Sequence, residues 1–231
     1  MDEFEYTTLT APDLYDKNLE ELITPISKEV SYAAKHIFLR PGEKIDYIYY
    51  IKSGRTKHYM DSHDGIVKML YALTPGWFFG ETPYFMNMPT GLYSQTETES
   101  VLYKIPGKQC DVLMRDNELF RDKIIKCFSH KMLIMRFEIA NLSFNSCKDR
   151  LKKLFSSSID TDSKNITDPS WYNLRTRYTH QELGEIVGGS RVTISRQINE
   201  LCKEGFVRML NRRIQVNQEK YKTYLRQQEG G

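Results

Sequence analysis

Three polar side chains near the C-terminus, Arg191, Ser195 and Arg196, have the types and the spacing to bond groups outside the protein. The apolar Ile194 and Ile198 alternate with these residues at helical spacing, four positions apart, so one helix would bury the isoleucines and present the polar residues to solvent. Guanidinium and hydroxyl donors on such a face can bond the base edges and the phosphates of DNA. The segment therefore predicts a contact with DNA.

Local signals around these residues predict a helix-turn-helix that would position them. Thr179 and Glu182 have the spacing of a capping box, which begins a first helix. Gly188 and Gly189 break that helix, and Ser190 can cap a second one by accepting hydrogen bonds from its free N–H groups. In this arrangement the second helix enters the major groove.

The segment that follows predicts a wing. Gly205 can end the second helix in the left-handed conformation. Residues 206–216 then give two short strands around a turn at Asn211 and Arg212, and Arg208, Arg212 and Arg213 would place cations near phosphates.

Charge is distributed unevenly along the chain. The residues from Ser146 onward include 16 lysines and arginines and 10 acidic residues, whereas the residues before it include 17 and 20. A basic C-terminal part beside an acidic N-terminal part fits phosphate contact by one domain only.

The N-terminal part predicts a different architecture. Residues 1–30 read as an irregular or helical lead-in, and short apolar runs with glycine turns from about Ser31 to Pro106 indicate a small β-barrel or sandwich. A helical pattern follows from about Asn117 to Leu142. Its length favours a coiled-coil seam with a second copy of the chain over packing on the barrel, which stays an alternative. The apolar stripe of this helix consists of Ile124, Phe128, Met132, Met135, Ile139 and Leu142.

Several classes of protein are disfavoured. The four cysteines lie far apart, which favours free reduced thiols over a zinc or iron–sulfur site. A cupin-type metalloenzyme needs a His-x-His motif, but His58 and His63 stand five residues apart, so no metal site and no enzyme are expected. There is no long apolar run, and the N-terminus is acidic where a secretory signal is basic, so we expect a cytoplasmic protein without a membrane partner.

Five segments in register resemble one family of bacterial transcription factors, the cyclic-AMP-receptor/fumarate–nitrate-regulator (Crp/Fnr) family. The segments are Pro41–Glu43, Tyr49–Arg55, Thr74–Glu81, the long helix and Thr179–Arg196. The resemblance implies an α+β fold with a β-roll effector domain over residues 1–116, a dimerisation helix over 117–144 and a winged helix-turn-helix domain over 145–231. It also implies a homodimer on a two-fold-symmetric promoter site, an activator role and RNA polymerase as a partner.

The resemblance further implies which residues contact DNA. Base contacts fall on Arg191, Val192, Ser195 and Arg196, and phosphate contacts on Thr179, Gln181, Ser190, Thr193, Arg212 and Arg213. Val192 stands where many relatives carry a glutamate that accepts from cytosine. Because valine has no acceptor but can pack on a thymine methyl, we expect an A·T-richer site.

Three known effectors of the family are disfavoured here. The cyclic-AMP-binding members place an arginine after Phe-Gly-Glu, whereas Thr82–Glu99 contains no arginine or lysine to hold a phosphate. The oxygen-sensing members use an N-terminal cysteine cluster, and residues 1–109 contain no cysteine. Haem would have to use isolated histidines, namely His36, His58 or His63.

A small aromatic anion is the effector that the sequence favours. Lys131 interrupts the apolar stripe of the long helix, where it is either exposed or paired with an anion. In this respect the chain is similar to the members that sense halogenated phenolic acids and hold the phenolate with a lysine. We expect a phenol or aromatic acid in a pocket between the barrel and the long helix; constitutive DNA binding without an effector is the alternative. The expected pocket residues are Tyr71, Gly80, Glu81, Tyr84, Tyr93, Phe128 and Lys131.

Overall fold

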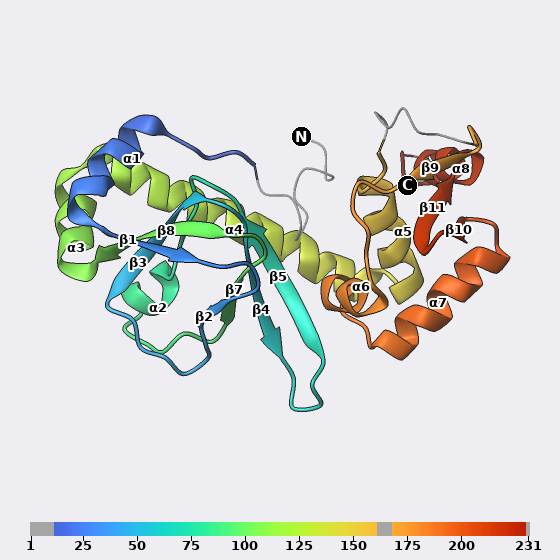
Figure 1. Cartoon of the computed structure of the whole chain (residues 1–231), viewed down its shortest axis with the longest axis horizontal. Coiled ribbons are helices and arrows are strands. Elements are labelled where there is room, and N and C mark those ends of the chain that lie inside the picture. The colour runs from blue at the N-terminus through green and yellow to red at the C-terminus, as the bar shows by residue number, and fades with distance from the viewer. Residues whose placement is uncertain (1–11, 161–167, 230–231) are drawn as a thin grey trace. The chain divides into compact units, whose positions relative to one another are not determined.

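A computed structural model describes residues 12–160 and 168–229 of the chain (Figure 1). The described residues form two compact units. The first contains the chain up to Asp61 together with Met69–Ile139, and the second contains Ser62–Lys68 and the chain from Ala140. No helix among the described residues is long and apolar enough to cross a membrane.

The first unit is built around a β-roll of two four-stranded sheets. One sheet has the order β1-β8-β3-β6 and the other the order β2-β7-β4-β5. The strands are β1 Lys28–Tyr32, β2 Ile37–Leu39, β3 Tyr47–Ser53, β4 Thr56–Asp61, β5 Val67–Leu73, β6 Phe78–Phe79, β7 Tyr93–Thr96 and β8 Ser100–Pro106.

Four helices complete this unit: α1 Lys17–Ile23, α2 Glu81–Phe85, α3 Gly107–Asp116 and the long α4 Glu118–Phe144, whose residues from Ala140 onward belong to the second unit. Asp16 begins α1 by accepting hydrogen bonds from two backbone N–H groups. Asn117 is extended and separates α3 from α4, and its side chain accepts from the N–H of Phe120 at 2.9 Å. Phe120 in turn packs edge-on against Phe78, with ring centroids 5.3 Å apart. The long helix therefore shares a core with the sheet.

The structure confirms the β-rich N-terminal part and the long helix, but it corrects several details. The first strand begins at Lys28, so residues 28–30 are not part of an irregular or helical lead-in, because β1 pairs with β8 along its whole length. That pairing joins residues far apart in the sequence, so the local pattern carries little sign of it. The elements β6, α2, β7 and α3 were not predicted either.

The second unit contains the predicted helix-turn-helix and wing. Its elements are α5 Cys147–Ser157, β9 Trp171–Asn173, α6 His180–Val187, α7 Arg191–Lys203, β10 Val207–Leu210, β11 Arg213–Asn217 and α8 Gln218–Glu229. The wing strands join β9 in a sheet of order β10-β11-β9. The strand β9 and the helix α8 were not predicted. The core of the unit includes Leu151, Phe155, Leu183, Ile194, Ile198, Leu201 and Val216.

Candidate nucleic-acid interface and effector site

The turn between α6 and α7 is fixed by caps and by close backbone contact. The Thr179 hydroxyl accepts from the N–H of Glu182 at 3.2 Å, and the Glu182 carboxylate accepts from the N–H of Thr179 at 2.7 Å. Gly188 ends α6 with φ +71°, a left-handed conformation that favours glycine. A Cβ on Gly184 would lie 2.4 Å from the carbonyl oxygen of Gly189, so the turn closes only on a glycine there. The predicted capping box and glycine break are confirmed.

Helix α7 has a buried face and an exposed polar face. The Ser190 hydroxyl caps it by accepting from the N–H of Thr193 at 3.1 Å. Ile194 and Ile198 are buried, and so is Leu201. On the opposite side, Arg191 and Arg196 are exposed and Ser195 is half-buried. The predicted division of the helix is thus confirmed.

Val192 is 80% exposed, although it is an apolar residue in the first turn of the helix. A valine at this position contributes nothing to the core of its own unit. It is therefore available to an apolar group of a partner, such as a thymine methyl.

The exposed face of α7 is longer than the expected set of base contacts. An open depression on the surface is lined by His180, Arg191, Val192, Ser195, Arg196, Asn199, Glu200 and Lys203. Asn199 and Lys203 continue the row from Val192 and Arg196 at helical steps of three and four residues. The same spacing rule would have found them in the sequence.

Four of the six residues that are expected to contact phosphates lie at two helix N-termini. Thr179 and Gln181 lie at the start of α6, and Ser190 and Thr193 at the start of α7. Backbone N–H groups without helical partners collect at such ends and favour anions. The Ser190 and Thr193 hydroxyls are hydrogen-bonded to each other at 2.9 Å, which leaves one of the two O–H groups to donate to a phosphate at the beginning of α7.

Two of the three wing arginines are exposed, and the third makes contacts within its own unit. Arg212 and Arg213 are exposed. Arg208 donates to Asp168 at 2.9 Å and to Gln215 at 2.7 Å, and its guanidinium lies 4.5 Å from the ring centre of Trp171. Arg208 therefore has partners within its own unit, and its approach to phosphates stays a prediction. Its charge and its donors hold the wing to the segment before β9.

In the first unit, Lys131 of α4 is buried in an ion pair. Its ammonium donates to Glu81 Oε1 at 2.5 Å and to the Phe78 carbonyl at 2.7 Å, and it lies 5.6 Å from the ring centre of Tyr71. Glu81 is 2% exposed and Lys131 7%. Burial is the largest single influence and lowers the pKa of Lys131, but the charge and hydrogen bond of Glu81 together with the smaller effects of Tyr71 and Cys127 raise the pKa overall. The alternative of an exposed Lys131 is wrong.

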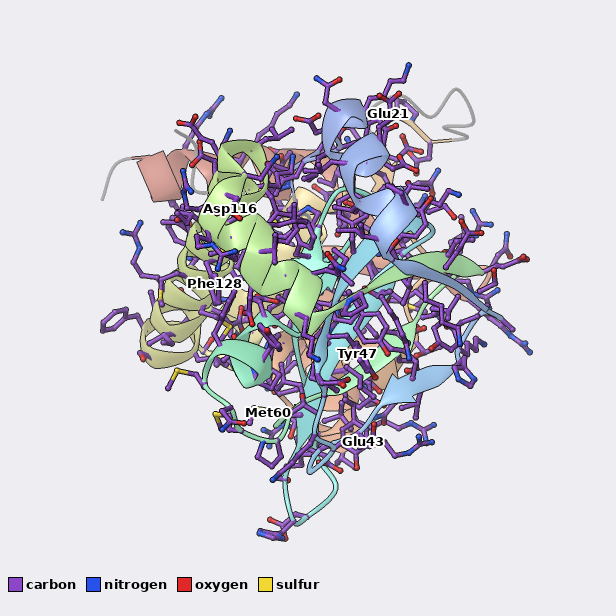
Figure 2. All side chains as sticks on the ribbon, turned by 90° about the vertical axis from the view of Figure 1, so that its left-hand side faces the viewer. Glu21, Glu43, Tyr47, Met60, Asp116 and Phe128 are labelled. Carbon is purple, nitrogen blue, oxygen red and sulfur yellow. The ribbon has the colours of Figure 1, made fainter. Side chains whose placement is uncertain are left out.

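The other expected pocket residues do not all meet at this pair. Gly80 precedes Glu81 and caps α2 in the left-handed conformation. The Tyr84 hydroxyl instead bonds Asp111 at 2.7 Å. Tyr93 stacks on Tyr59, and Phe128 lies beside Phe85 with ring centroids 6.4 Å apart (Phe128 is labelled in Figure 2). Tyr71 thus contacts the Lys131–Glu81 pair and Gly80 precedes it, whereas Tyr84, Tyr93 and Phe128 make these contacts with other residues.

The apolar stripe of α4 begins one residue later than expected. Ile124 is 1% exposed because it packs in the core of the first unit with Phe120 and Cys127. It therefore offers no surface to a second chain. Its neighbour Ile125 is 54% exposed. The row with strict steps of three and four is Ile125, Phe128, Met132, Met135, Ile139 and Leu142, and we call it the α4 seam.

Comparison with known proteins identifies both units. The protein-family model of the cyclic nucleotide-binding domain matches residues 29–117, and the family model of the Crp-like helix-turn-helix domain matches residues 157–221. The chain belongs to the Crp/Fnr family. It is a DNA-binding transcription regulator of the Crp/Fnr type, and the relatives that it matches are regulators and not enzymes.

Similarity to individual Crp/Fnr proteins extends over most of the chain. The cAMP-activated global transcriptional regulator CRP of Salmonella typhimurium is 24% identical over 178 residues, which cover 76% of this chain and 83% of the relative. The transcriptional regulator SdrP of Thermus thermophilus is 24% identical over 196 residues, covering 84% and 92%.

Solved structures of the family share the fold. The c-di-GMP responsive global regulator CLP of Xanthomonas campestris has a TM-score of 0.76 and 22% identity, covering 87% of this chain and 99% of that one. A structure of CprK complexed with OCPA has a TM-score of 0.65 and 19% identity, covering 91% and 95%.

One buried residue of this Crp/Fnr β-roll was considered in the sequence only as a ligand of haem or of a cupin-type metal. His58 of β4 is buried, and its ring nitrogens lie 3.1 Å from the Thr56 hydroxyl and 3.0 Å from the Ser94 hydroxyl. Its ring packs on Tyr71. The alternation of buried and exposed residues along β4 places Thr56 and His58 on the same inner face. Among the described residues, no group of three or more histidine, cysteine or acidic side chains could hold a metal ion.

His58 should make the Crp/Fnr fold sensitive to acid. Burial, and secondly the nearby Lys131 charge, lower the pKa of His58 well below its usual range. The unfolded chain then binds a proton below about pH 6.5 while the folded chain does not, so stability falls by about 1.4 kcal/mol per pH unit from this group. Between pH 7.5 and 5.5, urea unfolding should show a smaller loss of stability for His58→Gln than for the wild type. Equal losses would contradict this role of His58.

Proposed function

We propose that this Crp/Fnr protein binds a two-fold-symmetric, A·T-rich promoter site as a homodimer, and that a small aromatic anion at the buried lysine controls the binding. One observation carries the DNA part. Helix α7 presents Arg191, Val192 and Arg196 to solvent while Ile194 and Ile198 anchor its opposite face. Such a helix can enter a major groove without any change in its own packing.

The exposed residues of α7 match particular base edges. An arginine fork pairs with O6 and N7 of guanine, so Arg191 and Arg196 are suited to G·C pairs. Val192 lies between them and is suited to the methyl group of thymine. Each half-site should therefore contain a thymine at the position that Val192 faces.

Selection of binding sites from random duplexes tests this assignment. We expect the wild type to enrich a symmetric site with a thymine at the Val192 position. Val192→Glu should replace that preference with cytosine, because a carboxylate accepts from the cytosine N4 amino group. Val192 is exposed, so the substitution leaves the packing of the unit intact. Identical sites for the two proteins would contradict the contact.

The α4 seam supports the homodimer. Ile125, Met132 and Ile139 recur at intervals of seven, Phe128, Met135 and Leu142 do so as well, and the two rows alternate as the a and d positions of a coiled coil. Four of the six, Ile125, Met132, Ile139 and Leu142, are exposed in the single chain. A second copy of α4 would remove this apolar surface from water.

Disruption of the α4 seam should give a monomer. Ile139→Glu would place a carboxylate from each chain into the seam, where burial of both charges is unfavourable. Sedimentation velocity should show a dimer for the wild type and a monomer for Ile139→Glu, and the variant should bind a full DNA site far more weakly. Lys126→Glu is the matched control, because Lys126 is exposed on α4 outside the seam. A dimeric Ile139→Glu variant would contradict the assignment.

The buried pair supports an anionic aromatic effector. Lys131 is a desolvated cation beside the Tyr71 ring, and Glu81 Oε2 is buried and has no hydrogen-bond partner among the residues that the structure describes. A ligand with a phenolate or carboxylate group can replace Glu81 at Lys131 and stack near Tyr71. Such exchange would couple ligand binding to the position of α4.

A thermal-shift screen separates the effector classes. A ligand that binds the folded protein raises its melting temperature. We expect stabilisation by phenols or aromatic acids and none by cyclic nucleotides. The lack of stabilisation by any aromatic anion would favour the alternative, a regulator that binds DNA constitutively.

A further inference from the structure

The turn at the tip of the wing has an unusual residue at its second position. Leu210 pairs with Arg213, so only Asn211 and Arg212 form the turn, with φ +50° and +59°. Two consecutive residues with positive φ make a type I′ turn, in which asparagine followed by glycine is the favoured pair. Arg212 takes the position where glycine is unstrained. The backbone here would be more stable without the arginine.

The Arg212 side chain takes no part in the polar contacts of the described residues. Within residues 12–160 and 168–229, its guanidinium has no hydrogen bond and no ion pair, and the residue is exposed. Arg208 in the same hairpin contrasts with it, because its donors bond Asp168 and Gln215. A strained, protruding cation without an internal partner indicates that the partner is another molecule.

The shape of the wing restricts how that partner can be contacted. In Figure 1 the hairpin of β10 and β11 follows directly from the C-terminal end of α7, in the same compact unit. A two-stranded ribbon is too wide for a minor groove of about 6 Å, but one extended arginine can enter it. The minor groove of A·T-rich DNA is narrow and strongly negative, which favours an inserted guanidinium.

We propose that Arg212 inserts into the minor groove beside the bases read by α7 and selects A·T pairs there. The inference rests on the proposed DNA binding by α7. Selection follows from the narrow groove and from the lack of the guanine N2 amino group, which fills the floor of the groove at G·C pairs. Arg213 lies in the strand next to the turn and contributes charge at phosphates without this selection.

Duplexes with modified flanks test the proposal. The selected site is prepared with A·T, inosine·cytosine or G·C pairs on both sides of the segment read by α7. Inosine·cytosine presents the minor groove of A·T and the major groove of G·C. The wild type should bind the A·T and inosine·cytosine flanks equally and the G·C flank about tenfold more weakly. Equal binding of all three by the wild type would overturn minor-groove reading and leave a phosphate contact.

Arg212→Gly gives the decisive comparison. The variant should bind all three duplexes with the same reduced affinity, and its melting temperature should match or exceed that of the wild type because the turn strain is relieved. Arg213→Ala should weaken all three complexes by the same factor and keep the flank preference. An Arg212→Gly variant that keeps the preference would also overturn the proposal. A wild type that binds no duplex would contradict the proposed function itself, which is a distinct outcome.

Discussion

Lys131→Met should lower the free energy of unfolding by about 3–5 kcal/mol, because it leaves the Glu81 carboxylate buried without its cation. Both residues of the pair are almost fully buried, and Lys131 Nζ lies 2.5 Å from Glu81 Oε1. Urea unfolding of the two proteins at neutral pH measures the difference.

Two further variants separate the ion pair from the packing of the helix. Lys126→Met changes an exposed lysine of the same helix and should alter stability by no more than about 0.5 kcal/mol. The double variant Lys131→Met, Glu81→Leu removes both charges and should recover much of the loss. The account of the pair would be wrong if Lys131→Met were as stable as Lys126→Met.

The stabilisation by this pair should not depend on pH in the neutral range. The pKa of Lys131 is raised in the folded chain, so its contribution is fully present below the pKa of an unfolded lysine, about 10.4, and is lost only as the pH rises further. The acid sensitivity expected from His58 lies at the opposite end of the scale. The contributions of Lys131 and His58 to stability can therefore be measured separately in one protein, at alkaline and at acidic pH.

Arg196→Ala should weaken specific DNA binding by about 1–3 kcal/mol for each half-site, since a bidentate contact with guanine is lost. In a homodimer both half-sites lose it, so the combined effect is about twice as large. Fluorescence anisotropy with the selected duplex, at one fixed salt concentration, measures the change.

Two further variants show whether the loss of affinity is specific to the Arg196 guanidinium. Arg226→Ala removes an exposed arginine from α8 and should leave the affinity almost unchanged. Arg196→Lys keeps the charge but not the planar fork, so non-specific binding should remain while specific binding falls. If Arg196→Ala weakened binding no more than Arg226→Ala, Arg196 would not read a base.

The DNA-binding part could be predicted because its determinants are local. The capping box at Thr179, the break at Gly188 and the cap at Ser190 each act within one or two turns of helix. The wing turn at Asn211 is equally local. Signals of this kind survive in a single sequence, and the structure confirms all four.

The first unit was harder to predict, because the residues that determine it are distant in the sequence or ambiguous in type. Glu81 and Lys131 are 50 residues apart, and only the packing of α4 on the roll brings them together. Ile124 and Ile125 are identical neighbours, so hydrophobicity alone does not reveal which of them faces the core. The wing of the DNA-binding unit shows the same ambiguity: Arg208 and Arg212 have the same side chain in one hairpin, but within the described part of the chain only Arg208 has hydrogen-bond partners, Asp168 before β9 and Gln215 in β11.

The central claim is that a symmetric dimer reads DNA with both of its α7 helices. The affinity for DNA as a function of half-site spacing tests this claim most directly. The selected half-sites are moved apart by five base pairs and by further single steps, with their sequences unchanged, and the affinity of the wild type is measured for each duplex. Two α7 helices on one dimer require half-sites about one helical turn apart on the same side of the duplex, so five added base pairs should reduce the affinity to the non-specific level. An affinity that does not depend on the spacing would contradict a symmetric dimer that reads DNA with both helices.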